Sequence, residues 1–327
     1  MNILVTGAGG MVGSHMAEHL NAIGYGTVIG TYYKPTVDLK EIDSSVKMIE
    51  CDVRYPVSVE KVIGTYLPGQ IYHLAAQSYP TVSWDRPFET MDININGTIA
   101  VFEAVKKARD KMPGYDPMVV VACSSAEYGQ TLNELEGDEV YVKETAELKP
   151  LHPYGVSKVG QDLLALQYYM NDRIKCIRAR IFNSTGTRKM NDVTSDFTRR
   201  AVEAEAAHHY ILKVGNLSTR RAIMDQRDLV RALILLAEKG RPGDVYNISS
   251  ETVYQMSDIV SMIEKQIGVP FTIEVDPGLM RPTDERVIVG DVTKLKQATG
   301  WRQEIKMEQT IQDMLDYWRK RNHGSCG

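Results

Sequence analysis

Thr6-Gly7-Ala8-Gly9-Gly10-Met11-Val12-Gly13 is the stretch that decides the fold, and it directly follows the apolar run Ile3-Leu4-Val5. The apolar run predicts a short β-strand. Glycines at positions 7, 10 and 13 let the backbone of a strand-to-helix turn approach a pyrophosphate, which the helix N-terminus would bind. Without further evidence, a glycine-rich turn of this kind can equally be a tight connection between a strand and a helix that binds no nucleotide. Its candidate nucleotide-binding residues are Gly7, Gly10, Met11, Val12 and Gly13.

A second stretch, Tyr154-Gly155-Val156-Ser157-Lys158, carries the chemistry. A tyrosine and a lysine four residues apart share one helical face and can cooperate in proton transfer. The pair is weak evidence alone, but it follows an apolar strand ending in Ser124-Ser125, as a doubly wound nucleotide fold would order these parts. Together the two stretches predict a nicotinamide-dependent enzyme.

Composition excludes several classes of protein. The chain has 327 residues, 43% of them hydrophobic, and a net charge of −4, which favours neither nucleic acid nor an anionic membrane as a partner. The apolar run from Met118 to Cys123 is too short to cross a bilayer and predicts a buried parallel strand. Because the first strand is expected to begin at Asn2, we expect no signal peptide. Four scattered cysteines predict reduced thiols, a cytoplasmic location and no metal site.

Strand and helix patterns alternate along the chain. Strands are expected at 27–31, 46–51, 71–75, 118–124, 174–180, 245–248 and 271–275, and helices at 89–110, from Tyr154 to Tyr169, and at 225–238, 256–267 and 309–319. This order predicts an α/β fold, a Rossmann-type doubly wound parallel sheet with a smaller α/β substrate-binding lobe. We expect a nucleotide-binding domain at 1–180, to which segments of 181–250 can return, a lobe at 181–322 and a flexible tail at 323–327. The acidic stretch 134–147 is expected to be a surface loop.

Six motifs occur in the order typical of one family. They are the glycine turn, Asp52-Val53, His73 to Ser78, Asn94 to Thr98, Ser124 with Tyr154 and Lys158, and Arg180 to Asn183. The chain thereby resembles the extended short-chain dehydrogenase/reductase (NAD-dependent epimerase/dehydratase) family. It is most similar to the branch that holds GDP-mannose 4,6-dehydratase and GDP-4-keto-6-deoxymannose reductase. The supporting segments are 75–78, 83–84, 213–216, 243–247 and 281–284.

The resemblance implies roles for individual residues. Tyr154 would take the proton of a sugar 4-hydroxyl while hydride leaves C4, Lys158 would lower the phenol pKa and bind the nicotinamide ribose, and Ser124 would bond the same sugar oxygen. The implied cofactor contacts are Asp52, Val53, Ala75, Ala76 and Gln77, besides Tyr154, Lys158 and the glycine turn. The implied contacts to a nucleotide sugar, GDP-linked by this resemblance, are Ser78, Ser125, Asn183, Arg221, Arg281 and Asp284. Relatives also imply a homodimer or a higher homo-oligomer.

Ala126 departs from the family pattern. Relatives that dehydrate carry a glutamate there, and a methyl group cannot transfer a proton. Glu127 is the alternative acid, although neighbours on an extended segment point to opposite sides and only a local bulge would turn it inward. The reaction therefore stays open between a 4,6-dehydratase, which whole-chain similarity favours, and a 4-epimerase or 4-keto reductase. A catalytically silent NAD(P) sensor is disfavoured because the Tyr154 and Lys158 pair is intact.

The end of the second strand bears on the choice of cofactor. NAD enzymes usually place an acid there for the ribose 2′-hydroxyl, whereas this segment reads Gly30-Thr31-Tyr32-Tyr33-Lys34. The sequence therefore predicts NADP or NAD, with NADP preferred.

Overall fold

A seven-stranded parallel sheet forms the centre of the molecule in the computed structural model, which describes residues 1–190, 192–279 and 287–324. The strand order is β12-β7-β5-β4-β1-β2-β3. The bounds are β1 Asn2–Thr6, β2 Thr27–Tyr32, β3 Lys47–Glu50, β4 Gln70–His73, β5 Met118–Ser124, β7 Cys176–Ile181 and β12 Val245–Ile248. Every pairing is parallel, which confirms the predicted doubly wound α/β sheet.

Helices cover both faces of the sheet. Helices α1 (Met11–Ala22) and α9 (Gln226–Lys239) pack on each other and share one apolar core with the sheet. Helices α2 (Pro56–Tyr66), α5 (Gly97–Lys111) and α7 (Pro153–Asp172) contribute to a second core. Both faces need apolar side chains, which explains why the strands read as continuous apolar runs.

The predicted helix at 89–110 is interrupted. Helix α4 (Pro87–Met91) runs through a π-helical turn, η2 (Asp92–Asn96), into α5. Such turns insert extra backbone and often occur at functional sites. Here the turn carries Asn94, whose side chain is completely buried.

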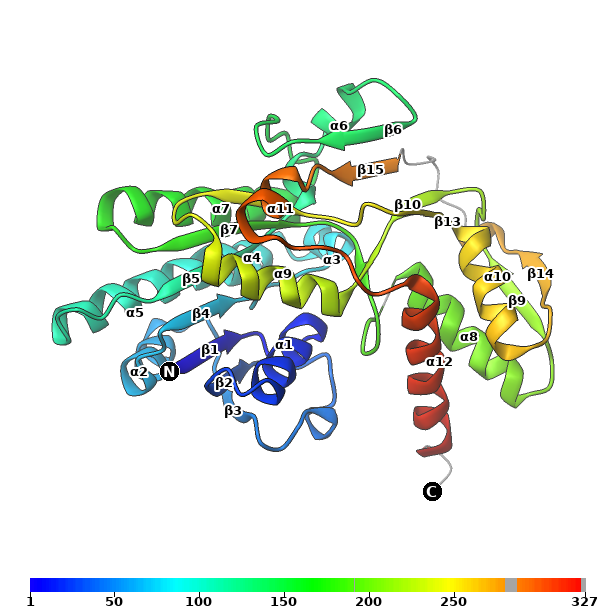
Figure 1. Ribbon diagram of the computed structural model, residues 1–327, viewed down its shortest axis with the longest axis horizontal. Helices are drawn as coiled ribbons and strands as arrows, with labels where there is room; N and C mark the ends of the chain where they lie inside the picture. Colours follow the sequence, from blue (N-terminus) through cyan, green and yellow to red (C-terminus); the bar gives the residue numbers. More distant parts are fainter. Residues whose placement is uncertain (191, 280–286, 325–327) are drawn as a thin grey trace.

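A smaller lobe lies beside the sheet, at the right of Figure 1. It contains α8 (Val193–Ala206), α10 (Met256–Ile267) and α12 (Met307–Gly324), which pack around their own core, and the parallel pair β9 (Ile211–Val214) and β14 (Thr272–Val275). Short pairs join β8 (Ser184–Thr185) to β11 (Met224–Asp225) and β10 (Arg220–Ala222) to β13 (Val253–Gln255). The remaining elements are η1 Leu39–Glu41, α3 Pro80–Asp85, η3 Ser125–Glu127, α6 Thr131–Glu134, η4 Pro277–Leu279 and α11 Thr293–Thr299.

One expectation about a loop is wrong. The stretch 134–147 contains strand β6 (Glu139–Val142), which pairs in parallel with β15 (Val287–Gly290) because Val140 and Val142 alternate into the interior. The flexible tail expected at 323–327 stays a prediction: α12 is described as far as Gly324, and residues 325–327 lie outside the described residues. The division of the chain at residue 180 remains a prediction, although β12 does return to the main sheet.

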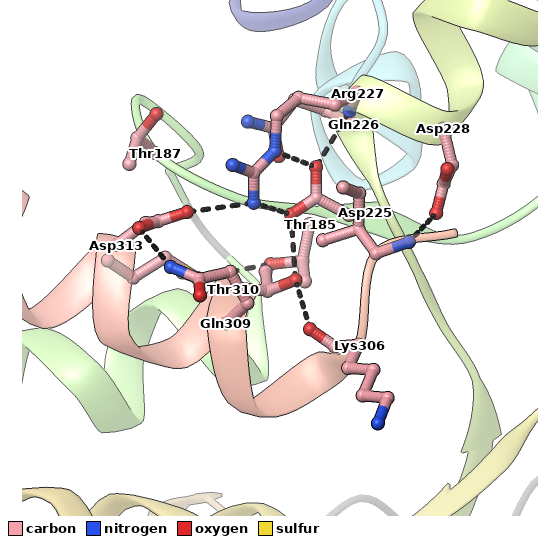
Figure 2. Close-up of polar contacts among 12 residues, drawn as sticks. Thr185, Thr187, Asp225, Gln226, Arg227, Asp228, Lys306, Gln309, Thr310 and Asp313 are labelled. Carbon is pink, nitrogen blue, oxygen red and sulfur yellow. Dashed lines mark hydrogen bonds and ion pairs between the residues drawn. The ribbon is translucent and has the colours of Figure 1, made fainter. Parts of the chain in front are cut away.

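Figure 2 shows how the N-terminal end of α9 holds the first turns of α12 and the segment that leads into that helix. Thr310 donates a hydrogen bond of 2.7 Å to the Asp225 carboxylate, and Arg227 pairs with Asp313 at 2.8 Å. The buried Asp228 carboxylate accepts the backbone N–H groups of Glu304 and Ile305. These contacts join the smaller lobe to α9, a helix that packs on the main sheet. No helix among the described residues is long and apolar enough to cross a membrane.

Candidate active site

The candidate site lies at the carboxyl ends of the central strands. Thr6 at the end of β1 pairs with His73 at the end of β4, and Ser124 at the end of β5 pairs with Ile181 on β7. The segments that follow these strands therefore meet at one edge of the sheet, where open α/β sheets bind ligands.

The glycine turn forms a cradle with no room for side chains. Gly7 has φ +72°, and a Cβ atom there would lie 2.7 Å from the Ala75 nitrogen. At Gly13 a Cβ atom would lie 2.2 Å from the Gly7 carbonyl oxygen. Helix α1 starts after Gly10 without a side-chain cap, so its first N–H groups, including that of Met11, are available to an anion. The turn fits a cofactor pyrophosphate.

Helix α7 brings Tyr154 and Lys158 onto one buried face. The Lys158 Nζ lies 5.7 Å from the centre of the Tyr154 ring and donates a 2.8 Å hydrogen bond to the Ala122 carbonyl. His152 caps the helix by accepting the Gly155 N–H at 3.0 Å. The cap and the strand carbonyl together fix the predicted pair.

Burial dominates the ionisation of this pair. It raises the pKa of Tyr154 to about 12, although a hydrogen bond with Ser124 opposes the rise. Burial also lowers the pKa of Lys158 to about 8. The net shift is upward because loss of water around Tyr154 outweighs its hydrogen bond with Ser124. The lowering of the phenol pKa by Lys158 stays a prediction for the cofactor-bound protein. Tyr154 carries its proton at neutral pH.

The turn after Ser124 is not the extended segment that we expected. Residues 125–127 form a 3₁₀ turn, η3, in which Ser124 accepts the Ala126 N–H at 3.2 Å and Glu127 Oε1 accepts the Ser124 N–H at 2.8 Å. A 3₁₀ turn repeats every three residues, so Glu127 comes back beneath Ser124. Glu127 is 0% exposed, whereas Ser125 and Ala126 are partly exposed. The turn thus presents hydroxyl and methyl groups, and no carboxylate, at its surface.

Polar side chains that sequence reasoning left without a role support the site from beneath. Asn94 donates to the Ser157 hydroxyl at 2.8 Å and accepts the Gln77 N–H at 2.8 Å. His73 lies between the hydroxyls of Thr6, at 2.9 Å, and Thr98, at 3.1 Å. Burial lowers the pKa of His73 to about 3, so its ring is neutral. The motifs that contain Asn94 and His73 were visible in the sequence. For His73, the available signal of a structural role was a polar residue at the end of an apolar strand.

A cationic cluster lies where β2 and β3 end. Arg54 donates to the Asp52 carboxylate, with its closest nitrogen at 2.6 Å, and lies 5.5 Å from the centre of the Tyr33 ring. Lys34 Nζ lies 5.4 Å from the centre of the same ring. Burial opposes ionisation of Asp52, but the bonds and charge of Arg54 outweigh it and lower the pKa of Asp52. Sequence reasoning missed Arg54, because only the fold brings it to Tyr33.

The other predicted residues have different surroundings. Gln77 is tied to α4, where its amide donates to the Thr90 hydroxyl at 3.0 Å, and to its own loop, where the amide donates to the Tyr79 carbonyl at 3.1 Å. Val53 is buried against Gly97. The partly exposed predicted residues are Ala75, Ala76, Ser125 and Arg221, and the exposed ones are Ser78 and Asn183. Arg281 and Asp284 lie outside the described residues.

Comparisons with known proteins agree with this geometry. The family model described as GDP-mannose 4,6 dehydratase matches residues 4–314. GDP-6-deoxy-D-mannose reductase from Pseudomonas aeruginosa is 26% identical over 98% of this chain and 97% of its own length. The structure of RMD from Pseudomonas aeruginosa complexed with NADPH superposes with a TM-score of 0.80 at 25% identity, covering 98% of this chain and 99% of that one.

A further solved structure is UDP-glucose 4-epimerase from Thermotoga maritima, with a TM-score of 0.85 at 24% identity over 98% of this chain and 100% of that one. At that identity the likeness concerns the fold. The match to the family model, the glycine cradle and the paired Tyr154 and Lys158 carry the assignment. The chain therefore belongs to the GDP-mannose 4,6 dehydratase family of extended short-chain dehydrogenase/reductases, as a nucleotide-sugar-modifying enzyme that uses NAD(P).

Proposed function

We propose that this enzyme is an NADP(H)-dependent oxidoreductase acting at C4 of a GDP-linked hexose, in the direction of 4-keto reduction. The observation that carries the proposal is the turn after Ser124, where Ala126 is partly exposed and Glu127 is completely buried. Dehydration needs a group that removes the C5 proton and expels the C6 hydroxyl. Reduction at C4 needs a proton donor and a hydride only, which Tyr154 and the cofactor can supply.

The ionisation of Tyr154 supports the direction of reduction. A phenol whose pKa is raised to about 12 by burial holds its proton at neutral pH and can donate it to a ketone oxygen. Ser124 would hydrogen-bond the same oxygen, and Lys158 would stabilise the phenolate that remains. Bound NADPH would supply the hydride. Each of these side chains lies at the end of a strand or on the buried face of α7.

Support for NADP over NAD comes from the cationic cluster of Lys34 and Arg54 on Tyr33. A ribose 2′-phosphate carries negative charge that two cations would attract, whereas NAD enzymes use an acid at this place. The nearby acid, Asp52, already accepts the Arg54 guanidinium. The related structure named with NADPH points the same way, although other related structures are named with NAD.

The GDP moiety is proposed from the names of the related proteins. Ser78, Ser125, Asn183 and Arg221 are the described candidates to bind the substrate, together with Arg281 and Asp284. Asn183 follows β7 two residues after the partner of Ser124, so it lies at the edge of the sheet that carries Tyr154. We keep these six residues as proposals.

A 4,6-dehydratase is the second candidate, because the matching family is described by that activity. This reading requires an acid other than Glu127. The experiment that separates the two readings supplies purified protein with GDP-4-keto-6-deoxymannose and NADPH, and in parallel with GDP-mannose and NADP. Oxidation of NADPH in the first mixture supports reduction. Loss of one water from GDP-mannose, seen by mass spectrometry, with no NADPH consumption in the first mixture, would replace reductase by dehydratase.

A homodimer is also proposed. Val156, Leu163 and Met170 recur every seven residues on α7, and their side chains are exposed, as are those of Trp84 and Phe88 on the adjoining α3 and α4. Exposed apolar side chains gathered on adjoining helices are typical of a contact surface. Light scattering of the Leu163→Glu variant, compared with wild type, tests this: a wild-type monomer would exclude the dimer.

A further inference from the structure

Glu127 makes two contacts that link separate parts of the catalytic site. Its Oε1 accepts the backbone N–H of Ser124 at 2.8 Å, and its Oε2 lies 3.2 Å from Arg180 Nε. The residue is 0% exposed, and Oε2 accepts no hydrogen bond among the described residues. A buried carboxyl group is costly unless its environment compensates it, so this arrangement calls for a role.

Arg180 on β7 connects Glu127 to the helix of the catalytic pair. Its Nε donates to the Asp162 carboxylate at 3.0 Å, and its NH1 donates to the Tyr128 hydroxyl at 3.0 Å. Asp162 lies one turn beyond Lys158 and two turns beyond Tyr154 on α7. The route Glu127, Arg180, Asp162 therefore joins the turn that bears Ser124 to the helix that bears Tyr154.

The titratable groups around Glu127 come from three elements. Cys123 lies on β5, Asp162 and Lys158 on α7, and Arg180 on β7. Burial and the Asp162 charge raise the pKa of Glu127 to about 8, against the effects of Arg180, the Ser124 N–H and Lys158. In its ionised form Glu127 in turn raises the pKa values of both Tyr154 and Lys158. Asp162 also pairs with Arg178 at 2.6 Å, so the two carboxyl groups face two guanidinium groups.

We propose that Glu127 is a positioning residue, which holds the turn bearing Ser124 against β7 and α7 and contacts no substrate. The inference rests on the proposed function only in taking Ser124 and Tyr154 as the groups that bind the sugar oxygen. The Glu127 carboxyl group faces the interior and supports Ser124 from there. The partly exposed position before it holds Ala126, which has no acidic group.

The test compares Glu127→Gln, Glu127→Met and the control Glu147→Gln, whose glutamate lies on the surface with its side chain 75% exposed. Glutamine keeps an acceptor for the Ser124 N–H, so we expect kcat and KM within about three-fold of wild type, as for an isosteric replacement. Methionine leaves that N–H without an acceptor and frees the turn. A displaced reacting group costs on the order of 100-fold in kcat, with KM little changed.

A second readout needs no sugar substrate. Carbon-13-labelled tyrosine, with the Tyr154 signal assigned by its loss in Tyr154→Phe, reports the titration of Tyr154 in the NADPH-bound protein. Glu127→Gln should titrate at lower pH than wild type, since a charge that raises the pKa is removed while Ser124 stays in place. Glu127→Met should titrate above Glu127→Gln, because freeing the turn also removes the Ser124 hydrogen bond that lowers this pKa. Glu147→Gln should titrate like wild type.

The proposal and the proposed function fail in different ways. Wild-type protein that turns over no nucleotide sugar would remove the proposed function, while the tyrosine titration would still decide the role of Glu127. Equal Tyr154 titrations in Glu127→Gln and Glu127→Met would overturn the positioning role. So would a Glu127→Gln variant that loses activity as completely as Tyr154→Phe, because Glu127 would then take part in proton transfer. If Glu127→Met fails to fold, Glu127→Ala, which also leaves the Ser124 N–H without an acceptor, replaces it in both measurements.

Discussion

The ammonium group of Lys158 donates a hydrogen bond to the carbonyl oxygen of Ala122 at 2.8 Å. This bond places the charge of a helix residue at the end of the central strand β5, next to Ser124. Burial lowers the pKa of Lys158 to about 8 in the folded chain, from 10.5 when exposed.

That shift predicts a pH-dependent stability. Between about pH 8 and pH 10.5 the unfolded chain binds a proton at Lys158 that the folded chain has lost, so the free energy of unfolding rises with pH in this window. Lys158→Met removes the effect. Denaturant unfolding of both proteins across the window should show wild type gaining stability relative to the variant as pH rises. Parallel pH curves would mean that Lys158 is not desolvated.

Replacing Tyr154 by phenylalanine should abolish turnover and keep the cofactor bound. The change removes only the hydroxyl, and loss of a general acid or base costs about 10²- to 10⁴-fold in rate. Steady-state kinetics and NADPH fluorescence titration measure the two properties. Tyr141→Phe, on the outer side of β6 and 61% exposed, is the matched control. Near-normal activity of Tyr154→Phe would take proton transfer away from this residue.

Alanine at Gly13 should disrupt the cofactor cradle. Its Cβ atom would lie 2.2 Å from the Gly7 carbonyl oxygen, a backbone atom that cannot move aside without opening the turn. We expect loss of NADPH binding and reduced thermal stability. Gly64→Ala is the control, since that position in α2 has open space around it and the change should stabilise the helix by about 0.5–1 kcal/mol. Equal melting temperatures for Gly13→Ala and wild type would contradict the cradle.

The Arg54 side chain should decide much of the preference for NADP. Arg54→Ala removes a cation from the cluster on Tyr33, so the Kd for NADPH should rise about ten-fold, as expected for one charge-assisted bond of about 1.5 kcal/mol, with the Kd for NADH little changed. Isothermal titration with both cofactors measures this. Arg86→Ala, at an exposed pair with Glu89, serves as the control. A parallel loss for NADPH and NADH would show that Arg54 acts through Asp52 or the fold.

The Asp228 carboxylate should contribute strongly to docking of the smaller lobe. Asp228→Ala leaves the N–H groups of Glu304 and Ile305 without their acceptor, which costs about 1–3 kcal/mol for each group that stays buried. Urea unfolding measures the loss. Asp316→Ala, at a half-exposed side chain on α12, should change the free energy of unfolding by less than about 0.5 kcal/mol. Similar free energies of unfolding for the two variants would show that Asp228 contributes no more to stability than a surface charge.

The sequence predicted those parts of the molecule that depend on local pattern. Apolar runs mark the parallel strands because both faces of the sheet are covered, and the glycine turn needs residues without a Cβ atom. The spacing of Tyr154 and Lys158 placed them on one helical face. In each case the residues that predict the feature lie close together in the sequence.

Features that depend on distant partners were not predictable in this way. The burial of the Glu127 side chain in the protein interior depends on its capping pair with Ser124 and on its contact with Arg180. Only the neighbouring strand supplies Arg180. Strand β6 was missed because its partner, β15, comes far later in the chain. The cluster of Arg54 on Tyr33 requires the ends of two adjacent strands to meet.

The position of β12 at the edge of the main sheet has a consequence for synthesis and for evolution. This strand follows α8 and β9 of the smaller lobe in the chain, yet it completes the sheet beside β7. A nascent chain on the ribosome cannot close its nucleotide-binding sheet until residues 245–248 have emerged, by which time much of the lobe has also been made. A single crossover between two genes at the start of the lobe would replace β12 together with it, so the hybrid sheet would join six strands from one parent to one strand from the other.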